Sequence, residues 1–306
     1  MSANLPSLYA QQFATNIALL LQQKGSKLRN LVSFKGDYVG KQVSPVDQIG
    51  AIEMQQVASR FAPMGRVDAA VDRRWVTPID FDLPQLIDTF DKLRLLNDPE
   101  SSYVQNAMFA AGRKLDDLII DAMFADAKTG ETGGTTTAFP SAVYPSGNSV
   151  SVSFGGTTTG LTIPKLKRAR RILVGNEVDT DSDPITCIVT AAQEEDLLNQ
   201  YEATSRDFNP TDRPVLKEGM LDRFLGMNFV RCERLDTGTD DAAGTSRAVP
   251  VFAKSGVHLA MWQESRTDVD QRKDLQGLPW QVYVYLTANA TRLEEKKVVR
   301  VWARES

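Results

Sequence analysis

The stretch that decides the fold is 98–127, DPESSYVQNAMFAAGRKLDDLIIDAMFADA. Apolar residues recur along it at three-and-four spacing, the pattern of a helix with one buried face; they are Val104, Ala107, Met108, Ala111, Leu115, Leu118, Ile119 and Ala122. Asp98 can cap the first turn, and Pro99 stands where a missing N–H costs nothing. A helix over 99–127 would have about 30 residues and span roughly 40 Å. Because globular helices average about a dozen residues, this one indicates a flat or elongated body.

Two segments of different character precede this helix. Residues 2–31 carry apolar side chains at roughly helical spacing and then become basic. They fit either a partly helical N-terminal arm or a helix docked on an ordinary domain, and both interpretations stay open. Residues 32–83 are punctuated by glycine and proline, so only short extended pieces such as 74–77 and 79–82 fit. We therefore expect a long extended loop, a kind of segment that is usually functional.

The residues after the helix predict a mixed lobe followed by β-structure, so the fold class we expect is α+β. The mixed lobe is expected to begin near Leu161, where strands and helices start to alternate along the chain. In chain order the expected elements are a hairpin strand over 149–154, a basic amphipathic helix over 165–174 opened by Pro164, an apolar strand over 185–189, a helix over 191–200, a strand after a glycine turn over 223–230, and two half-buried antiparallel strands around 282–286 and 299–303.

Composition excludes several classes of protein. The chain has 306 residues, of which 42% are hydrophobic and 24% charged, and its net charge is −4. A dedicated nucleic-acid binder would usually be basic. The longest aliphatic run, Ile17–Leu21, is far shorter than the roughly 20 apolar residues of a membrane helix, and it lacks the flanks of a secretory signal. Cys187 and Cys232 are too few for a disulfide framework and compatible with a reducing cytosol.

The search for catalytic chemistry gives one candidate pair. His258 is the only histidine and lies close to Ser255, which suggests a hydrolase. However, the chain has no Gly-x-Ser-x-Gly motif, and 252–261 has the pattern of a strand, a turn and a strand. We interpret His258 as structural. One histidine and two distant cysteines cannot supply a zinc site, and we expect no catalytic, metal or cofactor-binding residue.

Four short motifs match known binding patterns only in part. Asp179-Thr180-Asp181-Ser182-Asp183 lacks the glycine and distal glutamate of a calcium loop, and 155–160 lacks the lysine of a phosphate loop. Lys128-Thr129-Gly130 is one third of a penicillin-binding signature, and Asn289-Ala290-Thr291 is a glycosylation triplet without a secretion signal. We expect the aspartate-rich segment to be a solvated loop.

Charged residues gather on two of the expected helices. Asp116, Asp117 and Asp121 lie on the long helix, where we expect a solvated face. The next helix carries Lys167, Arg168, Arg170 and Arg171, which could meet phosphates or the acidic face of a neighbouring subunit. The negative net charge of the chain favours the neighbour.

The order of these parts resembles the major capsid proteins of tailed bacteriophages, which have the Hong Kong 97-like fold, over essentially the whole chain. Gln48-Ile49-Gly50, Arg73-Arg74-Trp75, Asp98-Pro99-Glu100-Ser101-Ser102-Tyr103 and the helix after them carry the resemblance. It implies an N-terminal arm over 1–31, an extended loop over 32–83 that lies over a neighbouring subunit, and a peripheral domain over 84–160 with a spine helix over 99–127. It further implies an axial domain over 161–249, whose loops meet at the five- and six-fold axes, and closing strands over 250–306 that return to the peripheral domain.

The resemblance also implies a function. The chain would self-assemble through pentamers and hexamers into the icosahedral head shell around the phage's double-stranded DNA, without being an enzyme. Its partners would be itself, scaffolding, portal and decoration proteins where these are used, and DNA contacted on the inner face without sequence specificity. It would have no membrane partner, would assemble in the host cytoplasm and would be located in the virion.

Two maturation features of such shells can be compared with this sequence. No residues match the Lys–Asn isopeptide crosslink that some of these shells use, so none is expected. Because Met1 stands shortly before the expected loop, scaffolding is expected to be separate or absent. Two alternatives to a phage head remain: an encapsulin-like nanocompartment shell of the same fold, and a hydrolase that uses Ser255 and His258.

Overall fold

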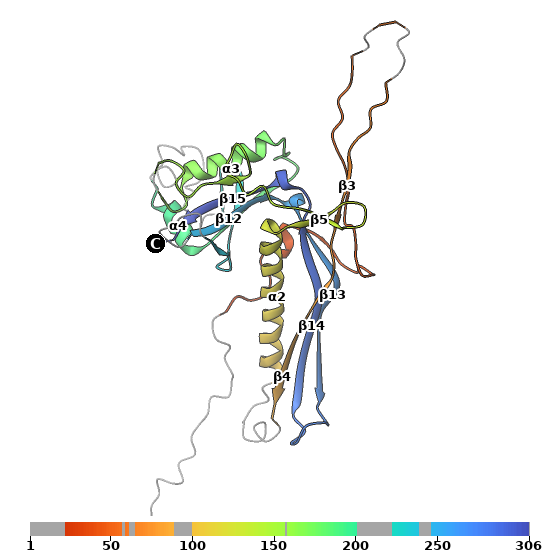
Figure 1. The fold of residues 1–306 in the computed structure, drawn as a ribbon. Helices are drawn as coiled ribbons and strands as arrows, with labels where there is room; N and C mark the ends of the chain where they lie inside the picture. Colours follow the sequence, from red (N-terminus) through yellow and green to blue (C-terminus); the bar gives the residue numbers. More distant parts are fainter. Residues whose placement is uncertain are drawn as a thin grey trace, which may run out of the picture. The chain divides into compact units, whose positions relative to one another are not determined.

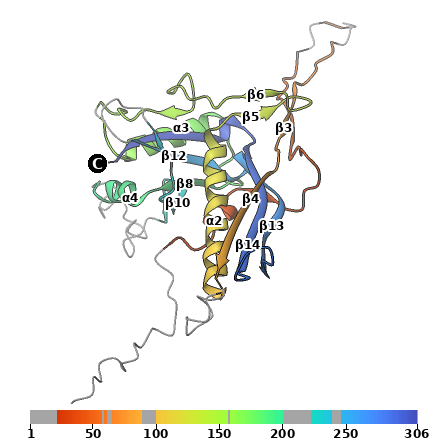
Figure 2. The same cartoon turned by 60° about the horizontal axis from the view of Figure 1, so that its bottom comes forward.

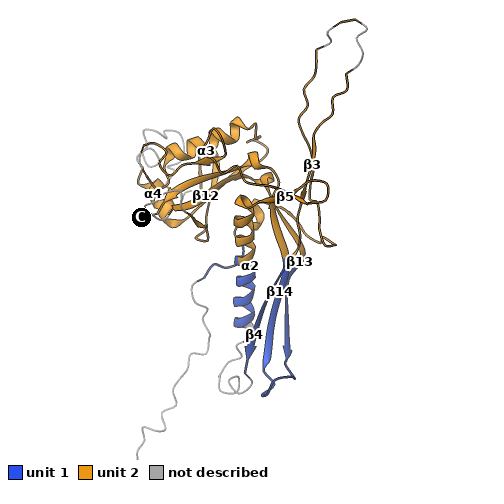
Figure 3. Ribbon diagram, viewed as in Figure 1, with its two compact units in different colours: residues 1–26, 80–113, 264–287 blue, residues 27–79, 114–263, 288–306 orange. Residues whose placement is uncertain are grey.

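The computed structural model describes residues 22–56, 59–60, 65–88, 100–156, 158–200, 222–238 and 246–305. Figure 1 shows the fold, and Figure 3 shows its two compact units. Unit 1 comprises 1–26, 80–113 and 264–287, and unit 2 comprises 27–79, 114–263 and 288–306. Helix α2 (Glu100–Phe124) and strands β13 (Val257–Gln271) and β14 (Trp280–Arg292) contribute residues to both units.

Unit 1 contains the first turns of α2, most of β4 (Ile79–Ile87) and the β13–β14 hairpin. Arg272 closes the hairpin: its backbone N–H donates to the carbonyl of Pro279 at 2.9 Å, and its guanidinium pairs with Asp274. Along β14, Val282, Val284 and Leu286 are buried and alternate with half-buried residues. The alternation expected around 282–286 is therefore confirmed. These strands belong to a four-stranded sheet of order β1-β13-β14-β4.

Unit 2 is built around a seven-stranded sheet. Its order is β7-β15-β12-β8-β10-β9, and β11 pairs with β12. The strands are β7 (Ser149–Val150), β8 (Ile185–Val189), β9 (Arg223–Phe224), β10 (Met227–Arg231), β11 (Thr237–Gly238), β12 (Ser246–Ala253) and β15 (Val298–Arg304). The strand expected over 185–189 and the alternation around 299–303 are confirmed.

Helix α3 (Ile163–Gly175) covers one face of this sheet. Leu166, Ala169 and Leu173 of α3 form one core cluster with every second residue of the central strands, such as Cys187 and Val251. Ile188 and Phe252 point the other way and are also completely buried. Figures 1 and 2 show the C-terminal turns of α2 on that other face. The sheet is therefore covered on both faces, as expected of an apolar strand such as β8.

A smaller sheet joins the predicted extended loop, 32–83, to the segment after α2. Its order is β2-β3-β5-β6, formed by β2 (Asp47–Ile49), β3 (Val71–Trp75), β5 (Ala127–Thr129) and β6 (Thr135–Thr137). β2 and β3 pair antiparallel as the two sides of a hairpin. Upstream, the 3-10 turn η2 (Arg29–Leu31) leads into β1 (Ser33–Lys35), which pairs parallel with β13. The short extended pieces expected between 32 and 83 are present.

The long helix is confirmed, with corrections. It ends at Phe124 rather than at 127, because Ala127 already pairs with Thr137 as the first residue of β5. The apolar stripe is buried at Ala107, Ala111, Leu115, Leu118, Ile119 and Ala122, whereas Met108 is 37% exposed. The expected cap, Asp98-Pro99, and residues 2–21 of the expected arm lie outside the described residues.

Two other elements differ from expectation. The strand expected over 149–154 stops at Val150, because the chain then turns: the N–H of Phe154 donates to the carbonyl of Ser151, and Gly155 and Gly156 both take positive φ. β7 pairs with β15 in parallel and is not part of a hairpin. Helix α4 (Ala191–Leu198) begins at a capping box of Thr190 and Gln193 and ends two residues before the expected 200.

The fold class is α+β, as expected, whereas the domain boundaries at 31, 83, 160 and 249 stay predictions. No helix among the described residues is long and apolar enough to cross a bilayer.

Candidate functional site

The two residues of the hydrolase alternative are bonded to other partners. Ser255 donates its hydroxyl to the carboxylate of Asp183, and its backbone N–H donates to the same group at 3.1 Å. His258 is 6% exposed, with Nδ1 at 2.9 Å from the hydroxyl of Ser33 and Nε2 at 3.1 Å from that of Tyr38. A general base must hydrogen-bond its nucleophile, and no such bond joins these two residues in the described part of the chain.

The hydrogen bonds of His258 fix its protonation. Ser33 donates its hydroxyl proton to the carbonyl of Val257 at 2.8 Å, so its oxygen accepts from the Nδ1–H of His258. Nε2 is then the acceptor for the hydroxyl of Tyr38. Burial, together with the nearby charge of Lys35, lowers the pKa of His258 to about 4. The ring is neutral at pH 7 and links β1 to β13, which favours the structural interpretation.

The aspartate-rich segment 179–183 forms a closed turn. Asp179 accepts from the hydroxyl of Ser182 at 2.5 Å and from the backbone N–H of Asp181 at 3.0 Å, and these bonds lower its pKa. The carboxylate of Asp183 accepts the hydrogen bonds from Ser255 described above. Among the described residues, no group of three or more His, Cys, Asp or Glu side chains is placed to hold a metal ion.

The carboxylates of the long helix do not share a solvated face, so that expectation is wrong. Asp116 is completely buried and accepts from the backbone N–H groups of Lys27 and Leu28 at 3.0 and 3.1 Å. It therefore fastens the segment before β1 to α2. Asp117 forms a two-pronged ion pair with Arg234, with nitrogen–oxygen distances of 2.5 and 2.6 Å. Only Asp121 is exposed.

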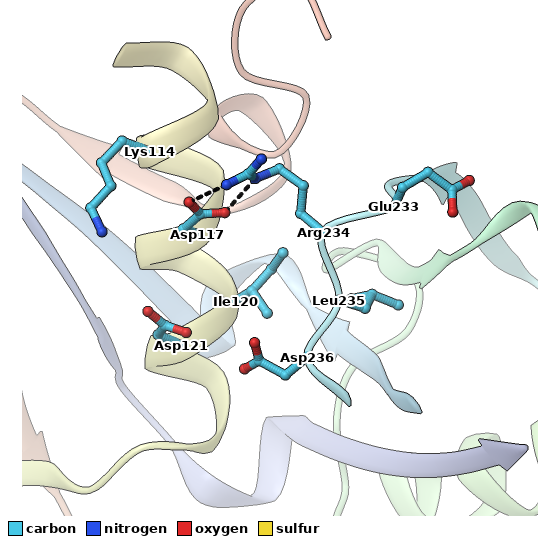
Figure 4. Close-up of a pocket in the computed structure, with 8 residues that line it drawn as sticks. All are labelled: Lys114, Asp117, Ile120, Asp121, Glu233, Arg234, Leu235 and Asp236. Carbon is cyan, nitrogen blue, oxygen red and sulfur yellow. Dashed lines mark hydrogen bonds and ion pairs between the residues drawn. The ribbon is translucent and has the colours of Figure 1, made fainter. Parts of the chain in front are cut away.

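Asp117 and Asp121 border a cavity of about 480 Å3. Figure 4 shows it between α2 and the segment after β10, with the Asp117–Arg234 pair at one end and Asp121 facing Asp236. Four carboxylates and two cations line it; the residues are Lys114, Asp117, Ile120, Asp121, Glu233, Arg234, Leu235 and Asp236. We call this the acidic pocket. The pKa of Asp121 is raised, first by burial and then by the negative charges of Asp236 and Asp117.

The basic helix α3 divides its cations between interior and surface. Lys165 is completely buried, and its Nζ donates to the carbonyls of Thr159, Gly160 and Trp302 at 2.7, 2.9 and 3.1 Å. The other four, Lys167, Arg168, Arg170 and Arg171, point away from the core, and all except the half-buried Arg168 are exposed. We call these four the basic face.

The β2–β3 hairpin exposes apolar side chains. Ile49 and Val71 face each other across the two strands and are 74% and 72% exposed. Beyond them, Ile52 and Met54 are 62% and 103% exposed, and Val67 is 45% exposed. Several large exposed apolar side chains on one hairpin are typical of a surface that another protein covers.

Buried arginines hold the base of this hairpin. Arg74 on β3 is 4% exposed and pairs with Glu295 at 2.8 Å. Arg292 is completely buried; its guanidinium donates to the carbonyls of Met123, Ala125 and Thr137 and lies 3.5 Å from Glu295. Arg292 thereby satisfies carbonyls left free where α2 ends. This cluster joins the base of the β2–β3 hairpin to Glu295 and to the end of α2.

Sequence reasoning missed the roles of Arg74, Arg292, Lys165 and Asp116. Charged residues are almost never fully buried unless they are paired, so Asp116 was expected on a solvated face and no structural role was expected for the other three. Only Arg74 carried a signal, as part of the Arg73-Arg74-Trp75 motif, and that signal gave no role.

Comparison with known proteins identifies the architecture. A family model described as phage capsid protein matches residues 5–305. The capsid of cyanophage P-SCSP1u aligns at 14% identity and TM-score 0.74, covering 100% of this chain and 96% of that chain. The capsid of cyanophage Pam1 aligns at 14% identity and TM-score 0.73, covering 98% of this chain and 97% of that chain. A chain of Mycobacterium phage Che8 aligns at 13% identity and TM-score 0.68, covering 96% of this chain and 97% of that chain. These likenesses show the Hong Kong 97-like fold. No curated protein matches the chain.

Proposed function

Because this chain belongs to the phage capsid protein family and is a shell-building component of the virion, we propose that its shell is the icosahedral head around the phage's double-stranded DNA. The observation that carries the proposal is the β2–β3 hairpin with its exposed apolar side chains. A chain that works alone would gain nothing from exposing Ile49, Val71 and Met54, whereas a subunit covered by its neighbours would bury them.

The hairpin is proposed to lie over an adjacent subunit. Its apolar pair Ile49–Val71 and the residues beyond would supply the buried area, and the arginine cluster at its base would set its direction. Identical chains in a closed shell occupy slightly different environments. An extended element on a rigid base suits that requirement, because the element can adapt while the body keeps its shape.

The chain is proposed to have no catalytic activity. Its role in the family is structural, and the hydroxyl of Ser255 and the ring of His258 are each engaged elsewhere. The net charge of −4 supports an inner surface that holds packed DNA without binding it tightly or reading its sequence. Scaffolding, portal and decoration proteins are proposed partners where the phage uses them, with assembly in the host cytoplasm.

The test is expression of the chain by itself, followed by light scattering and negative-stain imaging. Closed icosahedral particles of megadalton mass are expected. A stable monomer with esterase activity would refute the proposal in favour of a hydrolase. Particles purified from infected cells should contain phage DNA; a packaged host enzyme in its place would indicate a nanocompartment.

A further inference from the structure

The outer side of α3 carries positive charges that no ion pair between described residues neutralises. The helix contains no acidic residue, and no ion pair joins Lys167, Arg170 or Arg171 to another residue that the structure describes. Arg168 is held over the rings of Phe154 and Tyr144, at 4.8 and 5.4 Å from their centres. These contacts fix its position without neutralising its charge.

The spacing of these cations makes them repel one another. Lys167 and Arg171 are four residues apart, and Lys167–Arg170 and Arg168–Arg171 are each three apart, so all three pairs are neighbours on the helix surface. Like charges at these spacings destabilise a helix. An acidic surface placed against the basic face would relieve this repulsion.

Such a surface exists on the opposite side of the same unit. The acidic pocket is formed by α2 and the segment after β10, on the sheet face that α3 does not cover (Figures 1 and 2). Its carboxylates outnumber its cations, and Asp117 is already paired with Arg234. Asp121 and Asp236 face each other across the pocket (Figure 4), and their mutual repulsion would likewise be relieved by incoming cations.

We propose that the basic face of α3 docks on the acidic pocket of an adjacent copy, so that neighbouring subunits join head to tail. The proposal rests on the shell-building function proposed above and names one contact within it. Complementary surfaces on two different faces of one chain are what a heterologous contact needs, and such contacts close into rings when the rotation allows it. Packaged DNA would satisfy the basic face but would leave the acidic pocket without a partner.

The test is a charge swap. The first variant carries Arg170→Glu and Arg171→Glu, the second Asp121→Lys and Asp236→Lys, and the third carries all four changes. All four positions are exposed, so each variant should fold, which circular dichroism and urea unfolding would verify. The matched control is Lys128→Glu with Lys254→Glu, two exposed cations of the same unit outside both surfaces.

Shell yield should fall roughly tenfold or more in the first and second variants, because like charges then face each other across the contact. The third variant should recover most of the wild-type yield, and the control should match wild type. Should a reversal destabilise the subunit, Arg170→Gln with Arg171→Gln keeps the test open, with a smaller loss expected.

Two results would overturn the proposal. One is normal shell yield in the first variant; if those shells also held less DNA, the basic face would be assigned to DNA. The other is no recovery in the third variant although it folds. If wild-type protein formed no shells in the same experiment, the proposed function itself would fail, and that outcome is distinct from both.

Discussion

Replacing Arg292 with methionine should destabilise the subunit more than any surface change. Methionine fills much of the same volume but cannot donate to the carbonyls of Met123, Ala125 and Thr137, which lie 2.9, 2.8 and 3.2 Å from the guanidinium. These carbonyls lie where α2 ends and on β6, so the change removes the donors that join the two elements.

The expected loss in the free energy of unfolding depends on which groups keep a partner after Arg292→Met. Removing one partner of a buried charged pair costs about 3–5 kcal/mol. Glu295 would keep Arg74 as a partner at 2.8 Å, so it would not become an isolated charge. Burial also lowers the pKa of Arg292, which means that its charge is itself costly where it stands. We therefore expect the lower end, about 3 kcal/mol, against a total stability of about 5–15 kcal/mol for typical proteins.

The assay is urea unfolding of unassembled subunits separated from shells by size, with tryptophan fluorescence as the signal. Arg292→Lys is the matched control, because an ammonium group keeps the charge and can reach some of the three carbonyls. Its loss should be clearly smaller than that of Arg292→Met. A loss below about 1 kcal/mol in Arg292→Met would refute the reasoning, since it would lie within the range of an ordinary surface substitution.

The remaining predictions concern the long helix and the histidine. Leu118→Asp should prevent folding, because Leu118 is 7% exposed and an unpaired buried carboxylate costs several kcal/mol. The control is Met108→Asp at a 37% exposed position, which should stay soluble. A soluble, cooperatively melting Leu118→Asp protein would contradict the burial of the stripe. For His258, the ring stays neutral in the folded state down to its pKa of about 4, while the unfolded chain takes up a proton below 6.5. The free energy of unfolding should therefore decrease as the pH falls from 6.5 to about 4, by about 3 kcal/mol from this group alone. Parallel urea titrations should show a weaker pH dependence in His258→Gln; identical slopes would show that His258 does not contribute.

The sequence predicted those elements whose signal is local. The stripe of α2 and the alternation of β14 and β15 follow from periodicity, and the apolar run of β8 requires cover on both faces. Two expected elements failed, for different reasons. The last turn of α2 is lost because Ala127 pairs with Thr137, and the helical pattern gives no sign of that pairing. β7 ends at Val150 because the chain turns locally around Ser151–Phe154 and the glycines at 155 and 156, and the alternation of apolar and polar residues concealed that turn.

The candidate site was predictable only where it is exposed. The basic face was identified as a surface for a neighbour or for phosphates, because exposed charge on a helix is visible in the sequence. The buried charges could not be predicted from the sequence. Asp116 has the same local context as Asp117, and only the backbone N–H groups of Lys27 and Leu28, nearly ninety positions earlier, decide that one is buried and the other is not.

The position of β15 sets the order in which the chain can be finished during synthesis. Residues 298–304 form an inner strand of the seven-stranded sheet, between β7 and β12. Until the ribosome has released them, the side of β12 that pairs with β15 has unpaired N–H and C=O groups, and β7 has no partner strand. A nascent or prematurely terminated chain therefore cannot complete this sheet, and its open edge favours aggregation or degradation. Translation to at least Arg304 is therefore required before the seven-stranded sheet can be completed.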